Sequence, residues 1–291
     1  MMYLFNFFLA PFQDFAFMRH ALVACLALAL GCGPVGVLLV LKRMSLVGDA
    51  LSHAVLPGVA IGFLASGLSL YAMTLGGIVA GLAVALVAGA VARFTLLKED
   101  ASFAAVYLMS LALGVLIVSL RGSNIDLIHI LFGTILAVDD ADLVLVASIS
   151  SITLVTLSLI YRPLVVECFD PGYLRSVGGW GTVMHFIFLV LVVLNLVAGF
   201  RALGTLMAVG LMMVPAASAR FWAREVWSMA LVAVFIAMLS GYAGLILSFH
   251  VNLPSGPAII LTAGLCYIFS VMLGVHGSIY SRRKPGLHLG G

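Results

Sequence analysis

Asp49 and His53 are the two side chains whose types and spacing are best suited to binding a metal ion. They lie four residues apart within residues 48–58, GDALSHAVLPG, and residues at this spacing share one face of an α-helix. A carboxylate oxygen together with an imidazole nitrogen is a ligand set for divalent transition metals. The surrounding sequence is apolar, and an ionisable group within a membrane usually faces a cavity and has a function. The pair therefore predicts a path for a metal ion across a membrane.

Several questions about this pair stay open at the level of sequence. The alternative to a metal site is an internal hydrogen bond between Asp49 and His53 that fixes helix packing. Two ligands bind a metal weakly, which suits a transporter that must release its cargo, and a dimer axis would double the count to four. Methionine sulfur is a conceivable further ligand, but methionines in apolar helices more often serve packing. The methionines in question are Met207, Met212 and Met213.

The composition places the whole chain in a membrane. Of its 291 residues, 64% are hydrophobic and only 9% are charged, and the mean hydropathy is +1.26. Soluble domains have about 25% charged residues. The apolar runs are long and continuous, without the alternation of a membrane β-barrel, so we expect helical spans. The four cysteines form no CxxC pair, which argues against a disulfide framework or a zinc knuckle.

We predict an all-α, polytopic transmembrane bundle of about eight to nine spans. Residues 1–18 are rich in Phe and too short to span, so we expect an N-terminal interfacial segment. The transmembrane domain then covers residues 19–276, and residues 277–291 form a cytoplasmic tail. The candidate spans are residues 20–43, 46–66, 69–92, 101–120, 141–161, 181–200, 203–219, 226–248 and 255–275.

Two features inside these spans have alternative interpretations. Pro57 and Gly58 fall in mid-span, where they predict either a kink that opens a path or close helix packing. His185 stands alone in an apolar span, and we expect a buried histidine with internal partners rather than a metal ligand.

The basic residues predict the orientation. In the nine-span arrangement, eleven of the fourteen Lys and Arg residues fall on one side, and only Arg19, Arg121 and Arg201 fall on the other. The positive-inside rule then places the N-terminus outside and the C-terminus in the cytoplasm. We expect a bacterial inner (plasma) membrane protein.

The predicted outer side carries several acidic and histidine side chains. A rim of acids raises the local concentration of divalent cations. The alternative is that these residues only solvate two loops. The candidate rim residues are Asp126, His129, Asp139, Asp140 and His250.

The longest predicted cytoplasmic loop, residues 162–180, contains a short helix. Asp170 followed by Pro171 is typical of an N-cap and a first helical position, and Gly178 is typical of a C-cap. A short surface helix makes a good contact for a soluble partner, although an ordinary connector remains the alternative. The residues assigned to this contact are Asp170, Pro171, Gly172, Tyr173, Leu174, Arg175 and Gly178.

Four stretches together resemble the permease subunits of metal-ion ABC importers, the zinc, manganese and iron uptake family. Residues 42–58, KRMSLVGDALSHAVLPG, are similar to the family's signature. Residues 170–178 resemble its coupling helix, residues 204–219 its broken late helix, and residues 131–136 its external helix. The resemblance covers about residues 18–275. Gly172 departs from the pattern, because relatives often have an acidic residue there.

The resemblance implies a fold like that of the vitamin B12 importer permease and a metal-pathway role for Asp49 and His53. It implies a pore made with a second permease, either an identical copy or a closely related chain, together with two copies of a cytoplasmic ATP-binding subunit and an extracytoplasmic metal-binding protein. The expected cargo is Zn(II) or Mn(II), with Fe(II) also open. We expect no permanently bound cofactor. Membrane lipid is a further expected partner, and nucleic acid is not.

The expected function is therefore the membrane subunit of an ATP-driven metal importer, which is not itself an enzyme. The chain has no GxxxxGK[ST] phosphate loop, so ATP hydrolysis belongs to a separate subunit. The competing hypothesis is a self-sufficient secondary transporter or channel driven by an ion gradient. Such transporters often have inverted repeats, and no second Asp-x-x-x-His pattern occurs in the other half of the chain. Hydrolase motifs such as HExxH and GxSxG are also absent.

Overall fold

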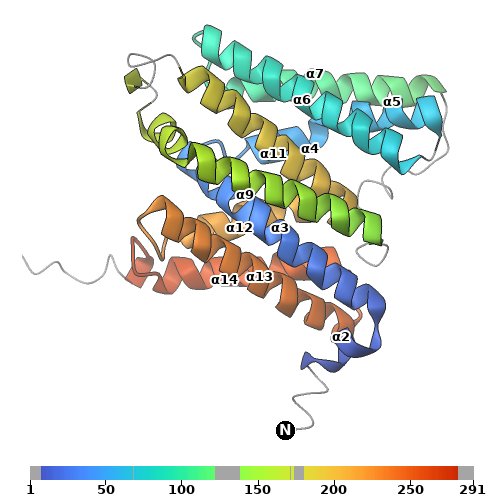
Figure 1. The fold of residues 1–291 in the computed structure, drawn as a ribbon, viewed down its shortest axis with the longest axis vertical. Helices are drawn as coiled ribbons and strands as arrows, with labels where there is room; N and C mark the ends of the chain where they lie inside the picture. The colour runs from blue at the N-terminus through green and yellow to red at the C-terminus, as the bar shows by residue number, and fades with distance from the viewer. Residues whose placement is uncertain (1–7, 68, 122–137, 171, 174–179, 281–291) are drawn as a thin grey trace, which may run out of the picture.

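The computed structural model describes residues 8–67, 69–121, 138–170, 172–173 and 180–280. The secondary structure elements in these ranges are α-helices, and these ranges contain no β-strand. The all-α prediction is thereby confirmed. Figure 1 shows the helices running side by side, with α6 and α7 at one edge and α13 and α14 at the other. The elements are α2 (Ala10–Asp14), α3 (Ala16–Leu41), α4 (Val47–Ala54), α5 (Leu56–Ser66), α6 (Leu70–Phe94), α7 (Glu99–Arg121), α9 (Asp140–Phe169), α11 (Gly181–Leu203), α12 (Thr205–Ala219), α13 (Val226–Val251) and α14 (Ser255–Leu273).

Eight of these segments are long and apolar enough to cross a membrane, with α4 and α5 together counted as one span. The ninth apolar segment, α12, has 15 residues. The predicted count of eight to nine spans is therefore confirmed for the described residues. α3 and α11 form the middle of the bundle, and about two thirds of the apolar window of each is buried.

The nine segments alternate in direction. Ion pairs and polar contacts bring together the end of α3, the end of α6, the start of α7, the end of α9 and the start of α11. We call this side of the bundle the Lys42 end. At the opposite side, the Asp140 end, the starts of α3, α6 and α9 meet the end of α11. The backbone N–H of His276 donates to the carbonyl of Phe221, so α12 and α14 finish on the same side.

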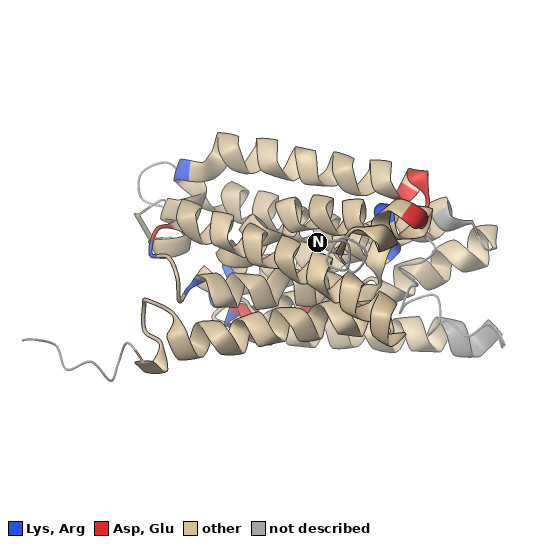
Figure 2. Ribbon diagram, turned by 90° about the horizontal axis from the view of Figure 1, so that it is seen from below, with Lys and Arg blue, Asp and Glu red and all other residues tan. Residues whose placement is uncertain are grey.

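Most charged residues lie toward these two ends of the bundle, and the ribbon between them is largely uncharged (Figure 2). This distribution fits helices that cross hydrocarbon, because a charge in the middle of a membrane is costly. At each end of the bundle, one buried ion pair joins two helices. Arg93 of α6 pairs with Glu167 of α9 at the Lys42 end, and Arg201 of α11 pairs with Asp142 of α9 at the Asp140 end.

One predicted boundary is wrong. The span expected at 141–161 continues without interruption to Phe169, through Pro163, so Glu167 belongs to a helix and not to a loop. The side chain of Glu167 is 1% exposed. Pairing with Arg93 explains this, because a carboxylate is buried in proteins only when it is paired.

Candidate metal-path site

A break between α4 and α5 shapes the predicted metal site. The two helices share one span, but α4 ends at Ala54 and α5 begins at Leu56, with Pro57 in its first turn. Proline is tolerated at this position because the N–H it lacks would have no helical partner there. Gly58 lies directly against α6, since a Cβ added to it would lie 2.0 Å from the carbonyl oxygen of Gly76. The close packing expected of Gly58 is thus observed, and the helix is interrupted at Val55, two residues before Pro57.

Asp49 and His53 lie on one face of α4, as their spacing predicts. Asp49 is in the first turn and His53 in the last turn, and His53 Nε2 lies 3.9 Å from Asp49 Oδ1. This distance allows an electrostatic interaction but is too long for a hydrogen bond. The internal hydrogen bond considered as the alternative is therefore absent. The His53 side chain is 48% exposed and that of Asp49 is 67% exposed, so both are open to a ligand.

Asp49 opens onto a small cavity between α4 and α7. Its volume is about 130 Å³, and its polar lining comes from Asp49, Asp100 and Tyr107. Leu46 and Phe103 contribute to its apolar wall. The cavity brings a second carboxylate, Asp100, to the same space as Asp49. Asp100 and Tyr107 could not be singled out from the sequence, because they are 51 and 58 residues away from Asp49 along the chain.

The described residues of a single chain hold no complete metal cage. No three His, Cys, Asp or Glu side chains are grouped closely enough among them to bind a metal ion. The methionine alternative gains little support, since Met207 and Met212 are buried in the hydrophobic core. Met212 instead packs near Gly48, where a Cβ would lie 3.1 Å from its methyl carbon. The described residues of one chain therefore bring together at most a partial ligand set.

A cluster of buried and half-buried ionisable side chains lies at the Lys42 end. The ring of His185 is buried, and its Nδ1 lies 3.5 Å from Lys42 Nζ and 3.7 Å from Glu99 Oε1. His185 is thus a buried histidine with internal partners, as predicted. Arg93 and Glu167 form the second half of the cluster. The sequence offered one signal for these contacts, namely that all five residues fall at span ends on the same predicted side.

The candidate rim at the Asp140 end separates into different roles. Asp139 caps α9: its Oδ1 accepts a hydrogen bond of 2.8 Å from the backbone N–H of Asp142. This bond holds the pKa of the Asp139 carboxyl below its ordinary value of 3.8. The Asp140 side chain is 90% exposed and its Oδ1 lies 3.6 Å from Nε2 of His20. His250 is in the last turn of α13, while Asp126 and His129 lie outside the described residues.

The predicted coupling segment begins as expected. Asp170 Oδ1 accepts a hydrogen bond of 2.9 Å from the backbone N–H of Tyr173, which is the contact of an N-cap. Gly172 and Tyr173 are helical and exposed. The other assigned residues, Pro171, Leu174, Arg175 and Gly178, lie outside the described residues.

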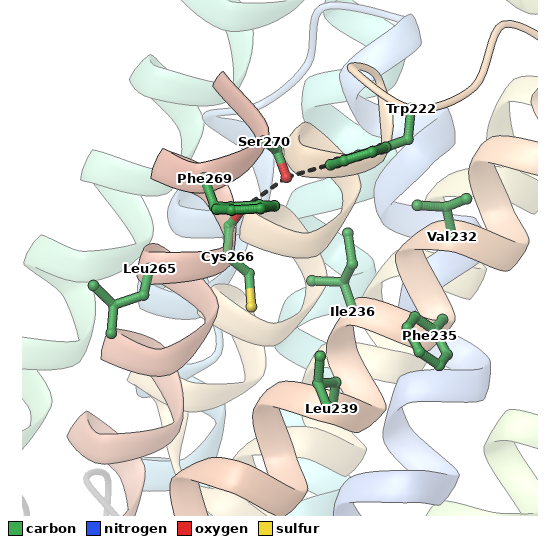
Figure 3. Close-up of a pocket in the computed structure, with 9 residues that line it drawn as sticks. All are labelled: Trp222, Val232, Phe235, Ile236, Leu239, Leu265, Cys266, Phe269 and Ser270. Atoms are coloured by element: carbon green, nitrogen blue, oxygen red, sulfur yellow. Dashed lines mark hydrogen bonds between the residues drawn. The ribbon is translucent and has the colours of Figure 1, made fainter. Parts of the chain in front are cut away.

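A larger hollow lies between α13 and α14. It has a volume of about 610 Å³ and an almost wholly apolar lining, drawn in Figure 3. Its polar groups are bonded to each other: Trp222 Nε1 donates to Ser270 Oγ at 2.8 Å, and Ser270 Oγ donates to the Cys266 carbonyl at 2.7 Å. It carries no charged side chain that could bind a metal ion.

The apolar helices define a multi-pass membrane protein, and the half-exposed Asp–His pair gives one of its spans a polar face. Residues 14–274 match the model of the ABC 3 transport family. The chain belongs to this family.

Named relatives agree with this assignment. The chain is 34% identical to the manganese import system permease protein ScaB of Streptococcus parasanguinis, over 91% of this chain and 94% of that protein. It is 33% identical to the manganese transport system membrane protein MntC of Halalkalibacterium halodurans, over 93% of each. The solved structure of PsaBC from Streptococcus pneumoniae in complex with Fab has a TM-score of 0.79 and 30% identity, covering 95% of this chain and 97% of that chain. ScaB is named as a permease protein and MntC as a membrane protein of a transport system, and this chain is a membrane permease of the same transport family.

Proposed function

We propose that this chain is the membrane subunit of an ATP-driven importer of divalent transition metal ions, with Asp49 and His53 on the path of the ion. The observation that carries the proposal is the exposure of both side chains within a membrane-spanning segment. Ionisable groups at such a position face water or a partner and not lipid, because lipid cannot solvate them. Membership of a transport family supports a transported ion as the reason for their presence.

The cargo that we propose first is Mn(II), with Zn(II) as the nearest competitor. The relatives ScaB and MntC are named for manganese import and transport. An oxygen and an imidazole nitrogen suit both metals, and carboxylate-rich sites favour Mn(II) more than thiolate sites do. Asp100, which lines the cavity beside Asp49, adds a further oxygen donor on the same side.

A second permease completes the path in this proposal. One chain supplies two ligands that its described residues leave about half exposed, and a two-fold axis would cover this face and double the ligands to four. The partners are therefore a second permease copy, a separate ATP-binding subunit in two copies and an extracytoplasmic metal-binding protein. The segment that starts at Asp170 is the proposed contact for the ATP-binding subunit, because an exposed, capped turn is accessible to a soluble protein.

The Lys42 end faces the cytoplasm in this proposal, and the Asp140 end faces outward. The distribution of Lys and Arg supports this orientation. The C-terminus is then cytoplasmic and the acidic Asp139–Asp140 end receives the metal. Residues 1–18 act as an interfacial segment, residues 19–276 as the permease domain and residues 277–291 as a cytoplasmic tail.

Uptake in proteoliposomes tests the proposal. The permease is reconstituted with its ATP-binding subunit, the binding protein is supplied loaded with Mn(II) or Zn(II), and uptake of each metal is followed with and without ATP. Asp49→Ala and His53→Ala are each expected to lower uptake by about tenfold or more, since losing even an outer partner of a metal ligand costs 10- to 100-fold. Asp14→Asn, an exposed acid at the end of α2 that is outside the proposed path and rim, serves as the matched control.

Two results would overturn the proposal. Uptake driven by a proton gradient in the absence of any ATP-binding subunit would identify a secondary transporter. Wild-type uptake by both Asp49→Ala and His53→Ala would place the metal path elsewhere in the chain. A ratio of Mn(II) to Zn(II) uptake below one would reverse the order of the two cargoes.

A further inference from the structure

One face of α7 packs along the break between α4 and α5. Tyr107, Ser110 and Gly114 are spaced at i, i+3 and i+7, so they share one side of this helix. Each contacts a different residue at the break. Tyr107 meets His53, Ser110 meets Ala54 and Gly114 meets Pro57.

The contact between Tyr107 and His53 is between their rings. The ring centroids are 6.4 Å apart and the planes are inclined by 30°, within the range in which aromatic rings attract one another. No hydrogen bond to the His53 ring is found among the described residues, and Asp49 is too distant to make one. The ring of Tyr107 is therefore the neighbour that orients this imidazole. The same tyrosine lines the cavity onto which Asp49 opens.

The other two contacts fix the backbone that carries His53. Ser110 Oγ donates a hydrogen bond of 3.2 Å to the carbonyl of Ala54, the last residue of α4. A helix end leaves carbonyls without helical donors, and a side-chain hydroxyl can supply one. Gly114 lets α7 approach closely, since a Cβ there would lie 3.1–3.2 Å from the atoms of Pro57. α7 thus holds both the ring of His53 and the end of its helix.

We propose that Tyr107 and Ser110 are positioning residues for the metal ligand His53, an inference that rests on the metal path proposed above. Neither residue needs to touch the ion. The ring of Tyr107 limits the rotation of the imidazole, and Ser110 limits the movement of the α4 end. An imidazole held in place loses less freedom when it binds a metal, which favours passage through a site of few ligands.

The test compares variants in the reconstituted importer with metal-loaded binding protein. Tyr107→Leu removes the ring but keeps an apolar side chain, Tyr107→Phe keeps the ring, and Ser110→Ala removes the donor. Tyr107→Leu is expected to lower the maximal rate of metal uptake by about twofold to tenfold, the equivalent of one aromatic pair. The KM for the loaded binding protein is expected to stay unchanged, because docking occurs elsewhere. Tyr107→Phe is expected to restore the wild-type rate.

Two comparisons separate positioning from general damage to the fold. Met109→Leu, an exposed position on the same helix, is the control and should match the wild type, with all rates normalised to folded permease by size-exclusion chromatography. In the His53→Ala background, Tyr107→Leu should cause no further loss, because residues that act through one another are not additive.

The outcomes distinguish this inference from the proposed function. If His53→Ala is defective while Tyr107→Leu matches the wild type, the positioning role is refuted and the metal path stands. The same refutation follows if Tyr107→Phe is as defective as Tyr107→Leu, or if the losses add in the double variant. Wild-type uptake by His53→Ala would instead refute the metal path.

Discussion

Replacing Glu167 by Gln is expected to destabilise the protein strongly, because it would leave the Arg93 charge buried without its partner. The two side chains are 8% and 1% exposed, so water cannot take over the solvation of the guanidinium. Removing one partner of a buried pair costs about 3–5 kcal/mol. A loss of 3 kcal/mol lowers the ratio of folded to unfolded protein by a factor of about 150.

Replacing both partners leads to a different expectation. Glu167 Oε2 and Arg93 Nε have no hydrogen-bond partner among the described residues, so the pair does not satisfy all of its polar atoms. Replacing a buried ion pair of this kind with apolar residues of similar size often leaves the stability of a protein unchanged or increases it. Arg93→Met combined with Glu167→Leu should therefore be close to the wild type in stability.

The measurement is the free energy of unfolding in mixed micelles titrated with SDS, for the wild type, both single variants and the double variant. A second readout is the rate at which a fluorogenic maleimide labels Cys25 and Cys32, which are fully buried in the fold. Glu225→Gln, an exposed loop acid, is the control and should stay within about 0.5 kcal/mol of the wild type. The reasoning fails if Glu167→Gln also stays in that range, or if the double variant loses as much as the two single variants summed.

Two further predictions follow from the packing and the helix caps. Gly76→Ala should destabilise the folded protein by about 1–3 kcal/mol, since the added Cβ would lie 2.2 Å from the Gly58 carbonyl oxygen. Gly264→Ala should be neutral, because nothing lies within 4 Å of the added Cβ. Equal SDS midpoints for the two variants would contradict this expectation. The lowered pKa of Asp139 means that its stabilising effect is present above the unfolded-state pKa of about 3.9 and is lost below it. The unfolding midpoint should therefore fall more steeply from pH 5 to pH 3 in the wild type than in Asp139→Asn, and identical slopes would exclude this role.

The helical spans could be predicted from the sequence because hydrocarbon imposes a simple requirement, a continuous apolar run of about 20 residues. The predicted span 226–248 corresponds to α13 and 255–275 to α14, within a few residues at each end. The same criterion failed at the end of α9. Residues 162–169 contain Arg162, Pro163 and Glu167, a composition typical of a loop. They are helical in the structure, where Arg93 of another helix pairs with the Glu167 carboxylate.

The candidate site was only partly accessible from the sequence for a related reason. Asp49 and His53 are local, four residues apart on one helix, so their shared face follows from helical geometry alone. Asp100, Tyr107 and Ser110 reach the same place from a helix that begins more than 40 residues later, and such a contact depends on how helices pack. The spacing of Tyr107 and Ser110 along α7 points to the site only when the position of the α4–α5 break is known.

The length of α9 has a consequence for how a soluble partner could approach the protein. Its 30 residues make a helix of about 45 Å, or about 42 Å across the membrane at a typical tilt of about 20°. A bilayer is about 30 Å thick in its hydrocarbon core and about 40–45 Å with its headgroups. α9 is therefore long enough to cross the headgroup layers as well as the hydrocarbon, and if it is centred in the bilayer Asp170 lies at the level where the bilayer meets water. A protein that binds there need not displace or dehydrate any lipid headgroup.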